Sequence, residues 1–181
     1  MKNKSIIIYL CDYFDEKIIN EVVYKIERTI HCPVTLKKFE IDVTNFYYPG
    51  RRQYDANKLL KVFSDLKNPC ALKKIGLFKV DLFIPILTFI FGQAILNGDT
   101  GVISKFRLRN ELYGLKRDDN LLAERLAKVF IHELGHMFGL IHCQNPGCVM
   151  NSSTYVEHID QKDQEFCSKC RENLGHNKLS N

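Results

Sequence analysis

The stretch HELGHMFGLIH, which begins at His132, constrains this chain more than any other part of its sequence. In a helix, His132 and His136 stand at i and i+4, so that their side chains lie one turn apart on the same face. Two imidazoles placed in this way can bind one Zn²⁺, and Glu133 lies beside the metal without binding it. Gly139 allows the chain to leave the helix through a left-handed turn, which can bring His142 back as a third nitrogen ligand. Three protein ligands leave a fourth position for water, as is typical of a catalytic zinc site.

A chance occurrence is the alternative explanation, because the spacing HExxH also arises on ordinary amphipathic helices. The pair of histidines alone would leave that alternative open. Gly139 and His142 at their fixed offsets make chance a poor explanation. The sequence therefore predicts a catalytic zinc ion bound by His132, His136 and His142, with Glu133 as the catalytic residue.

The composition is that of an ordinary globular protein, with 181 residues, 45% hydrophobic and 26% charged. This length predicts one domain, residues 1–181, with a sizeable core. The net charge of +5 comes from scattered lysines and arginines, which solvated surfaces explain better than a nucleic-acid-binding stripe does. We therefore expect no nucleic-acid partner and a monomer.

Three features indicate a cytoplasmic protein that does not associate with membranes. The apolar run that follows Ser5 is shorter than the roughly seven residues of a signal-peptide core. The longest apolar stretch, 82–96, is interrupted by Pro85 and Gly92 and is too short for a bilayer span of about 20 residues. The seven cysteines are an odd number in a chain too long to need disulfides, which favours a reducing compartment.

The apolar periodicity predicts an alternation of strands and helices before the histidine motif. The apolar run from Ser5 to Leu10 is typical of a strand buried on both faces. Asn97-Gly98 predicts a hairpin turn, and the alternation of polar and apolar residues after it predicts a half-buried strand. The expected strands are 5–10, 34–41, 75–83, 89–96 and 101–109. The expected helices are a first one that Asp12 or Asp15 caps and Pro33 ends, and further ones at 52–66, 120–138 and 161–167. This order indicates an α+β fold, a mixed five-stranded sheet with helices packed on it, followed by a small irregular lobe.

Four cysteines follow the histidine motif and predict a second metal site. Cys167 and Cys170 are separated by two residues, and Cys143 and Cys148 flank a Gln-Asn-Pro-Gly turn, so that each pair can present two sulfurs to one ion. A closed Cys₄ site is typical of structural zinc, which contributes on the order of 10 kcal/mol to the folding of a lobe this poor in apolar residues. Two disulfides, or a redox-active Cys-x-x-Cys pair, are the alternatives. Because Cys143 directly follows His142, the structural site would also hold the third catalytic ligand.

Taken together, HELGHMFGLIH, Met150 and the four cysteines resemble the archaemetzincins, a family of the metzincin zinc peptidases. Cys167 follows Met150 slightly sooner than the family pattern has it. The resemblance implies a metzincin-like fold with an upper subdomain, residues 1–139, and a small C-terminal subdomain, residues 140–181, that contains the Cys₄ zinc. It also implies that Met150 packs beneath the three imidazoles, and that the strand from Ile90 to Ala94 is the sheet edge above the cleft.

The function that this resemblance implies is zinc-dependent hydrolysis of peptide bonds. A zinc-bound water would attack the scissile carbonyl, with Glu133 as general base and a peptide or protein as substrate. We expect two zinc ions per chain, one catalytic and one structural. A zinc-containing binding module without catalytic activity, and a zinc hydrolase acting on an amide other than a peptide, are the alternatives.

Overall fold

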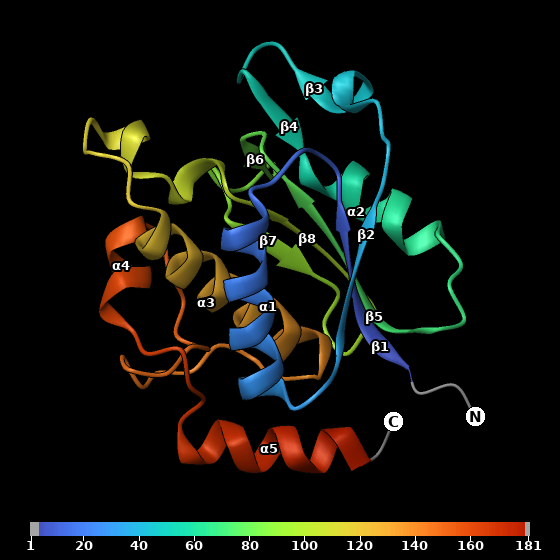
Figure 1. The fold of residues 1–181 in the computed structure, drawn as a ribbon, viewed down its shortest axis with the longest axis vertical. Helices are drawn as coiled ribbons and strands as arrows, with labels where there is room; N and C mark the ends of the chain where they lie inside the picture. The colour runs from blue at the N-terminus through green and yellow to red at the C-terminus, as the bar shows by residue number, and fades with distance from the viewer. Residues whose placement is uncertain (1–3, 180–181) are drawn as a thin grey trace.

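A five-stranded sheet forms the centre of the computed structural model, which describes the backbone of residues 4–179 and the side chains of residues 4–175. The strand order is β2-β1-β5-β8-β7 (Figure 1). The first four strands are parallel to one another, and β7 at the edge is antiparallel to β8. The strands are β1 (Ser5–Leu10), β2 (Val34–Lys38), β5 (Ala71–Phe78), β7 (Gly92–Ala94) and β8 (Thr100–Ser104). The expected mixed five-stranded sheet is thus confirmed.

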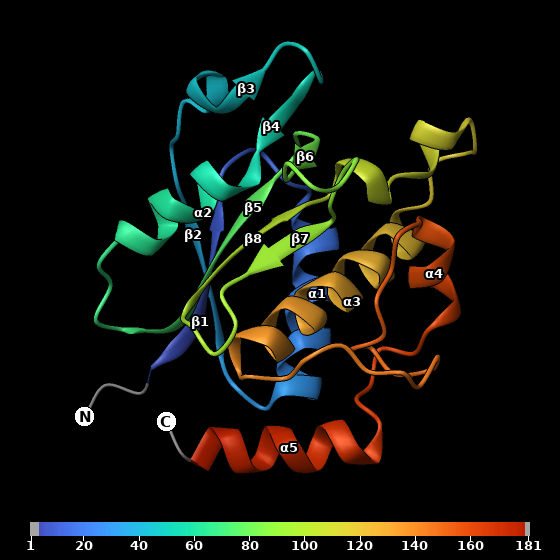
Figure 2. The ribbon, with the colours of Figure 1, turned by 180° about the vertical axis from the view of Figure 1, so that it is seen from behind.

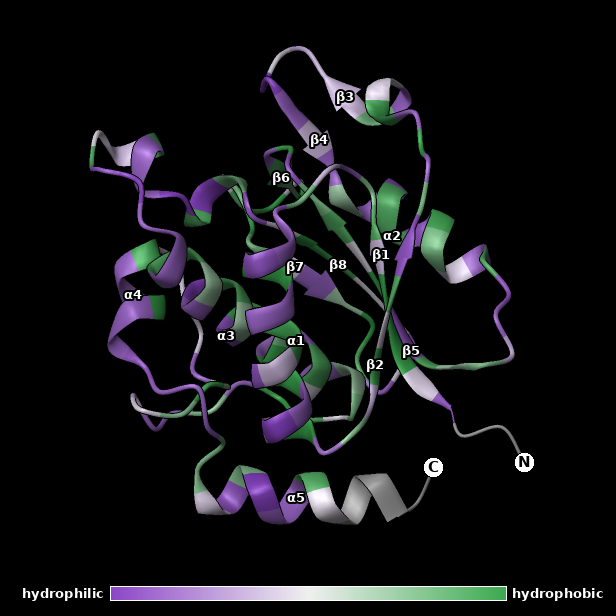
Figure 3. Cartoon of the chain, viewed as in Figure 1, coloured by the Kyte–Doolittle hydropathy of each residue, from purple (hydrophilic) through white to green (hydrophobic). Residues whose placement is uncertain are grey.

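Three helices cover the two faces of this sheet. Helices α1 (Glu16–Ile30) and α3 (Asp119–Met137) lie together on one face, and α2 (Ala56–Asp65) lies on the other (Figures 1 and 2). Asp15 caps α1, because its carboxylate accepts hydrogen bonds from the backbone N–H groups of Lys17 and Ile18. The strands between them are mostly hydrophobic, whereas α1 alternates between hydrophilic and hydrophobic faces (Figure 3). Burial of apolar surface on both faces of the sheet therefore holds α1, α2 and α3 against it.

Strand β8 differs from the expectation in its burial and in its length. All five of its residues are buried, because α2 and α3 cover the sheet there from opposite sides. The alternation seen in the sequence continues beyond Ser104, where the chain forms a short 3₁₀ helix, Phe106–Leu108, and not a strand. The predicted half-buried strand from 101 to 109 is therefore wrong in both respects. The hairpin itself is confirmed, with Asn97 in the left-handed region at its turn.

A small second sheet was not predicted from the sequence. It contains β3 (Tyr47–Tyr48), β4 (Gln53–Asp55) and β6 (Leu82–Phe83), strands too short to show a period. Residues 53–55 belong to this sheet, so α2 begins later than expected, after the capping residue Asp55. The predicted strand 75–83 is likewise two strands, β5 and β6, separated at residues 79–81.

The C-terminal part of the chain contains two helices, α4 (Val156–Gln161) and α5 (Ser168–Leu179). The helix predicted at 161–167 is wrong, because Gln161 ends α4 and the connection between the two helices is formed by residues 162–167. Their polar groups bond to the loop before α4: Lys162 Nζ donates to the Val149 carbonyl, and the Asp163 N–H donates to the Gly147 carbonyl. A 3₁₀ helix at Val43–Phe46 and another at Asn110–Tyr113 complete the elements. Within residues 4–179, no helix combines the length and apolar character that crossing a membrane requires.

Candidate metal centres and active-site cleft

The last turns of α3 and the loop after it bring three imidazoles together. His132 and His136 lie on α3, which ends at Met137, and Gly139 turns the chain back with φ of 87°. His142 follows, and its ring centroid lies 5.2 Å from that of His132 and 4.9 Å from that of His136. One ring nitrogen from each of the three lies within 4.8 Å of the others. This is the geometric arrangement expected from the sequence.

The hydrogen bonds of the first two imidazoles fix which nitrogen of each is protonated. Nδ1 of His132 lies 2.8 Å from the Val149 carbonyl oxygen, and Nδ1 of His136 lies 2.8 Å from the Leu140 carbonyl oxygen. A carbonyl oxygen only accepts, so each Nδ1 carries the proton and donates it. The two Nε2 atoms are 3.1 Å apart, and in the neutral rings both present lone pairs. Two facing acceptors repel each other unless a cation lies between them, and nitrogens bound to one zinc ion at about 2.1 Å in a tetrahedral site would be roughly 3.4 Å apart.

Burial also keeps these imidazoles in the neutral form that binds metals. Desolvation lowers the pKa of His132 well below its ordinary value, and the positive charge of Lys162 adds to this effect. Burial likewise lowers the pKa of His136 and of His142. Neutral rings with oriented Nε2 lone pairs are a donor set suited to Zn²⁺.

Glu133 lies one residue after the first histidine and faces the edge strand β7. It is 6% exposed, and no other described residue forms a hydrogen bond or an ion pair with its carboxyl group. Burial raises its pKa to about 8, an effect that the charge of Lys162 partly offsets. A Cβ atom on Gly92 would lie 2.9 Å from both Cγ and Oε1 of Glu133. The absence of a side chain at Gly92 therefore provides the space that the carboxyl group occupies.

Met150 lies in a tight turn, residues 148–151, packed against the histidine helix. Its side chain is fully buried, and a Cβ atom on Gly135 would collide with its sulfur. Gly135 is the residue between Leu134 and His136, so the methionine packs on the part of α3 that carries the histidines. This packing agrees with the predicted placement of Met150.

A cleft with a volume of about 680 Å³ contains the three imidazoles and Glu133. One of its walls is strand β7, and Phe89, Phe91, Val129 and Ile159 provide an apolar surface beside the imidazoles. The expected sheet edge above the cleft is therefore present. Lys162, which also lines the cleft, was missed in the sequence because an isolated lysine in a polar segment carries no motif.

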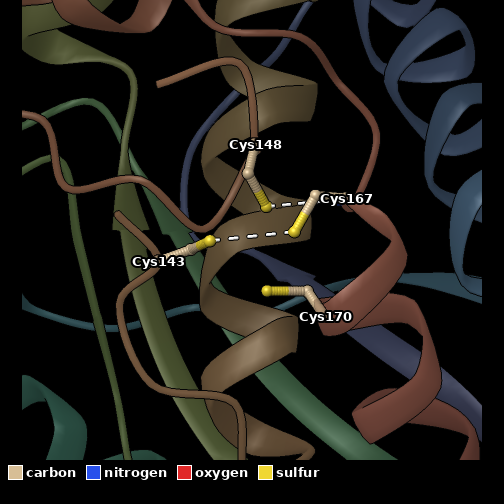
Figure 4. A group of neighbouring side chains, drawn as sticks. All are labelled: Cys143, Cys148, Cys167 and Cys170. Atoms are coloured by element: carbon tan, nitrogen blue, oxygen red, sulfur yellow. Dashed lines mark hydrogen bonds between the residues drawn. The ribbon is translucent and has the colours of Figure 1, made fainter. Parts of the chain in front are cut away.

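The four C-terminal cysteines form a second cluster, in which their sulfurs point toward one another (Figure 4). All four sulfurs lie within 4.8 Å of each other, and those of Cys143 and Cys167 are 3.7 Å apart. Four sulfurs at Zn–S distances of about 2.3 Å would be roughly 3.8 Å apart, so the cluster has the size of a tetrahedral zinc site. All seven cysteines of the chain lie in its described part and are free thiols, which contradicts the alternative of two disulfides.

The position of Cys167 favours the thiolate form that binds metals. It precedes the first residue of α5, and the backbone N–H of Cys170 donates to its sulfur, which lowers the pKa of the Cys167 thiol to about 7. Helix N-termini stabilise thiolates in this way. Burial has the opposite effect at Cys148, whose pKa is raised.

Backbone hydrogen bonds connect the cysteine cluster to the histidine cluster. The N–H of Cys143 donates to the Met150 carbonyl, and the side-chain amide of Asn151 donates to the Cys143 carbonyl. Cys143 is adjacent to His142 in the chain. The two candidate metal centres therefore share the loop that carries the third imidazole.

Comparison with known proteins places the whole chain in one family. The profile of Peptidase family M54 matches residues 3–176. The Archaemetzincin of Saccharolobus solfataricus is 33% identical over 171 residues, which are 94% of this chain and 92% of that protein. The Archaemetzincin of Thermococcus kodakarensis is 41% identical over 129 residues, 71% of this chain and 69% of that protein.

Solved structures show the same fold. The crystal structure of Archaemetzincin from Methanopyrus kandleri matches with a TM-score of 0.86 and 31% identity, covering 98% of this chain and 97% of that chain. A zinc-dependent peptidase from Methanocorpusculum labreanum matches with a TM-score of 0.83 and 29% identity, covering 94% of this chain and 100% of that chain. The chain therefore belongs to peptidase family M54, the family of the archaemetzincins.

Proposed function

We propose that this chain, a zinc metallopeptidase by family, hydrolyses peptide bonds at a zinc ion held by His132, His136 and His142, with Glu133 as general base. The observation that carries the proposal is the pair of Nε2 atoms 3.1 Å apart, both with lone pairs, beside a buried carboxyl group. A zinc ion bound there supplies Lewis acidity to a water molecule and to the scissile carbonyl.

Glu133 provides the proton transfers of this proposed reaction. Burial raises the pKa of this carboxyl group, so its ionised form is a stronger base than an exposed carboxylate, and it can accept a proton from water and return it to the leaving amine. The space opposite Gly92 keeps the carboxyl group free of hydrogen bonds to the described residues, so it is available to the water molecule. The carbonyls of Val149 and Leu140 hold the two imidazoles in one tautomer.

The peptide substrate would bind along strand β7. This strand pairs with β8 on one side only, so its other edge can accept an extended peptide as an additional antiparallel strand. The strand lines the cleft together with the imidazoles, which would place a peptide bond next to them. The apolar surface of Phe89, Phe91, Val129 and Ile159 can accommodate an apolar side chain of the substrate.

A second zinc ion would bind to Cys143, Cys148, Cys167 and Cys170. Four thiolate ligands close the coordination sphere and leave no position for water, so this zinc would be structural. The size of the sulfur cluster supports the proposal. A monomeric state, a cytoplasmic location, the absence of nucleic-acid partners and the division at residues 139 and 140 stay predictions.

The proposed function is tested by profiling the cleavage of a peptide library with the purified protein. We expect defined cleavage sites, loss of cleavage after removal of zinc with a chelator, and recovery after zinc is restored. Cleavage that continues in the metal-free protein would contradict the proposal. Hydrolysis of small non-peptide amides alone would support the alternative of an amide hydrolase.

Replacing Gly92 by alanine is expected to lower kcat on the order of 10²-fold, because the new Cβ atom displaces the Glu133 carboxyl group. The zinc content and the melting temperature should change little, since Gly92 does not adopt a positive φ. Gly101→Ala is a matched control on the neighbouring strand, where the nearest atom, the Gln93 carbonyl oxygen, is 3.3 Å away. Equal kcat values for Gly92→Ala and Gly101→Ala would show that the catalytic role of Glu133 does not require the space opposite Gly92.

A further inference from the structure

Lys162 is a buried lysine next to the active site that the proposed reaction does not use. It lies directly after α4, is 5% exposed and lines the cleft. No carboxylate among the described residues lies within ion-pair distance of it. A buried charge that forms no ion pair is costly, so its backbone contacts must offset the cost, together with the longer-range attraction of the Glu133 carboxylate.

The ammonium group donates to two backbone carbonyls of the Met150 turn. Its Nζ atom lies 2.9 Å from the Val149 oxygen and 2.8 Å from the Asn151 oxygen, the carbonyls on either side of Met150. The Met150 oxygen itself accepts from the N–H of Cys143. The three successive carbonyls of Val149, Met150 and Asn151 thus each accept a hydrogen bond from a residue outside the turn.

One of these carbonyls also orients an imidazole of the active site. The Val149 oxygen accepts hydrogen bonds both from Lys162 Nζ and from His132 Nδ1, the latter at 2.8 Å. A carbonyl oxygen has two lone pairs, so both donors can be accommodated. The position of this oxygen determines the ring orientation of His132, and Lys162 is its second donor.

We propose that Lys162 is a positioning residue for metal binding, which holds the Met150 turn so that the Val149 carbonyl orients His132. This inference rests on the proposed zinc site. Outer partners of a histidine ligand fix its tautomer and orientation, and their loss weakens metal binding by about 10- to 100-fold. The outer partner of His132 is the Val149 carbonyl, and Lys162 acts on His132 through its hydrogen bond to this carbonyl.

The test compares Lys162→Met with the matched control Lys128→Met. Lys128 also donates to backbone carbonyls, those of Ile159 and Asp160 at the end of α4, and it does not contact the Met150 turn. Zinc affinity of the metal-free protein is measured by competition with a chelator, and the visible spectrum of the Co²⁺-substituted protein reports the ligand geometry. We expect roughly 10-fold or more weaker binding and an altered Co²⁺ spectrum for Lys162→Met only.

Equal zinc affinity and equal Co²⁺ spectra in the two folded variants would overturn the inference. Should Lys162→Met fail to fold, Lys162→Gln provides the same comparison, because its amide is one atom shorter and cannot reach both carbonyls. Wild-type affinity in that variant would also overturn the inference. A failure of the proposed function would be seen in a different variant. If no zinc binds at the three histidines, His132→Ala would contain as much zinc as the wild-type protein.

Discussion

Replacing Glu133 by glutamine is expected to lower kcat by about 10²- to 10⁴-fold while the zinc content stays unchanged. Glutamine has the shape of glutamate and fits the space opposite Gly92, but its neutral amide cannot accept a proton from water. The carboxyl group has no hydrogen-bond partner among the described residues, so its replacement breaks no hydrogen bond to the protein. Stability should therefore be preserved or slightly increased, since a buried ionisable group is removed.

The matched control for this variant is Glu124→Gln on the same helix, where the side chain is exposed. It changes the net charge equally and should retain full activity. The measurements are kcat and KM on a peptide found by library profiling, together with zinc content by mass spectrometry. Unchanged turnover in Glu133→Gln would sink the assignment of the general base, whereas lost zinc would make Glu133 a ligand and not a base.

This variant also separates the peptidase from a binding module without catalytic activity. A module that only binds peptides would bind them equally well with glutamine at residue 133, and neither form would cleave them. A peptidase would bind peptides without cleaving them only in the variant. The same protein thus serves as a substrate trap, whose bound peptides identify the preferred sequence.

The candidate site could be predicted from the sequence because its chemistry is local. His132, His136 and His142 lie within one helix and the turn that follows it, so that helical geometry and the freedom of Gly139 suffice to bring them together. The cysteines are farther apart in the chain, but two closely spaced pairs, Cys143 with Cys148 and Cys167 with Cys170, are a spacing typical of structural zinc sites. The strand and helix order was likewise predictable from long apolar periods such as that of β1.

Contacts between distant segments were not predictable in the same way. The position of Lys162 is determined by its hydrogen bonds to the carbonyls of Val149 and Asn151, and no sequence periodicity indicates such contacts. The same contacts replaced the predicted helix at 161–167, since polar side chains there bond to another loop. The burial of β8 on both faces depends on where α2 packs, which is a property of the assembled fold.

Gly92 is a residue whose role the sequence indicates in general terms and the structure specifies. A glycine in a strand indicates a bulge or a close approach of the backbone to another group. The structure identifies that group as the carboxyl of Glu133, 41 residues later in the chain. The edge strand and the active-site helix therefore fit each other at the residue proposed to carry out the proton transfers.

Replacing both Cys167 and Cys170 by serine is expected to remove one zinc ion per chain and to unfold the C-terminal segment. Structural zinc provides on the order of 10 kcal/mol, which is comparable to the whole stability of a typical domain, about 5–15 kcal/mol. Of the described side chains of α5, only those of Cys170 and Leu174 are buried in the core, so little besides the cysteine cluster holds this helix in place. The measurements are zinc content and the thermal unfolding midpoint, with Cys70→Ser, a free thiol away from the cluster, as the control.

The same double variant should also weaken zinc binding at the three histidines. His142 precedes Cys143, so loss of a metal from the Cys143 sulfur would leave the loop held there only by the backbone hydrogen bonds of Cys143 to the Met150 turn. His132 and His136 lie on α3 and keep their positions, so the remaining site has two fixed nitrogens and one mobile nitrogen. Retention of two zinc ions at the wild-type midpoint would contradict the Cys₄ site. Loss of one zinc with unchanged affinity at the other would instead show that α3 and Gly139 alone position the third imidazole.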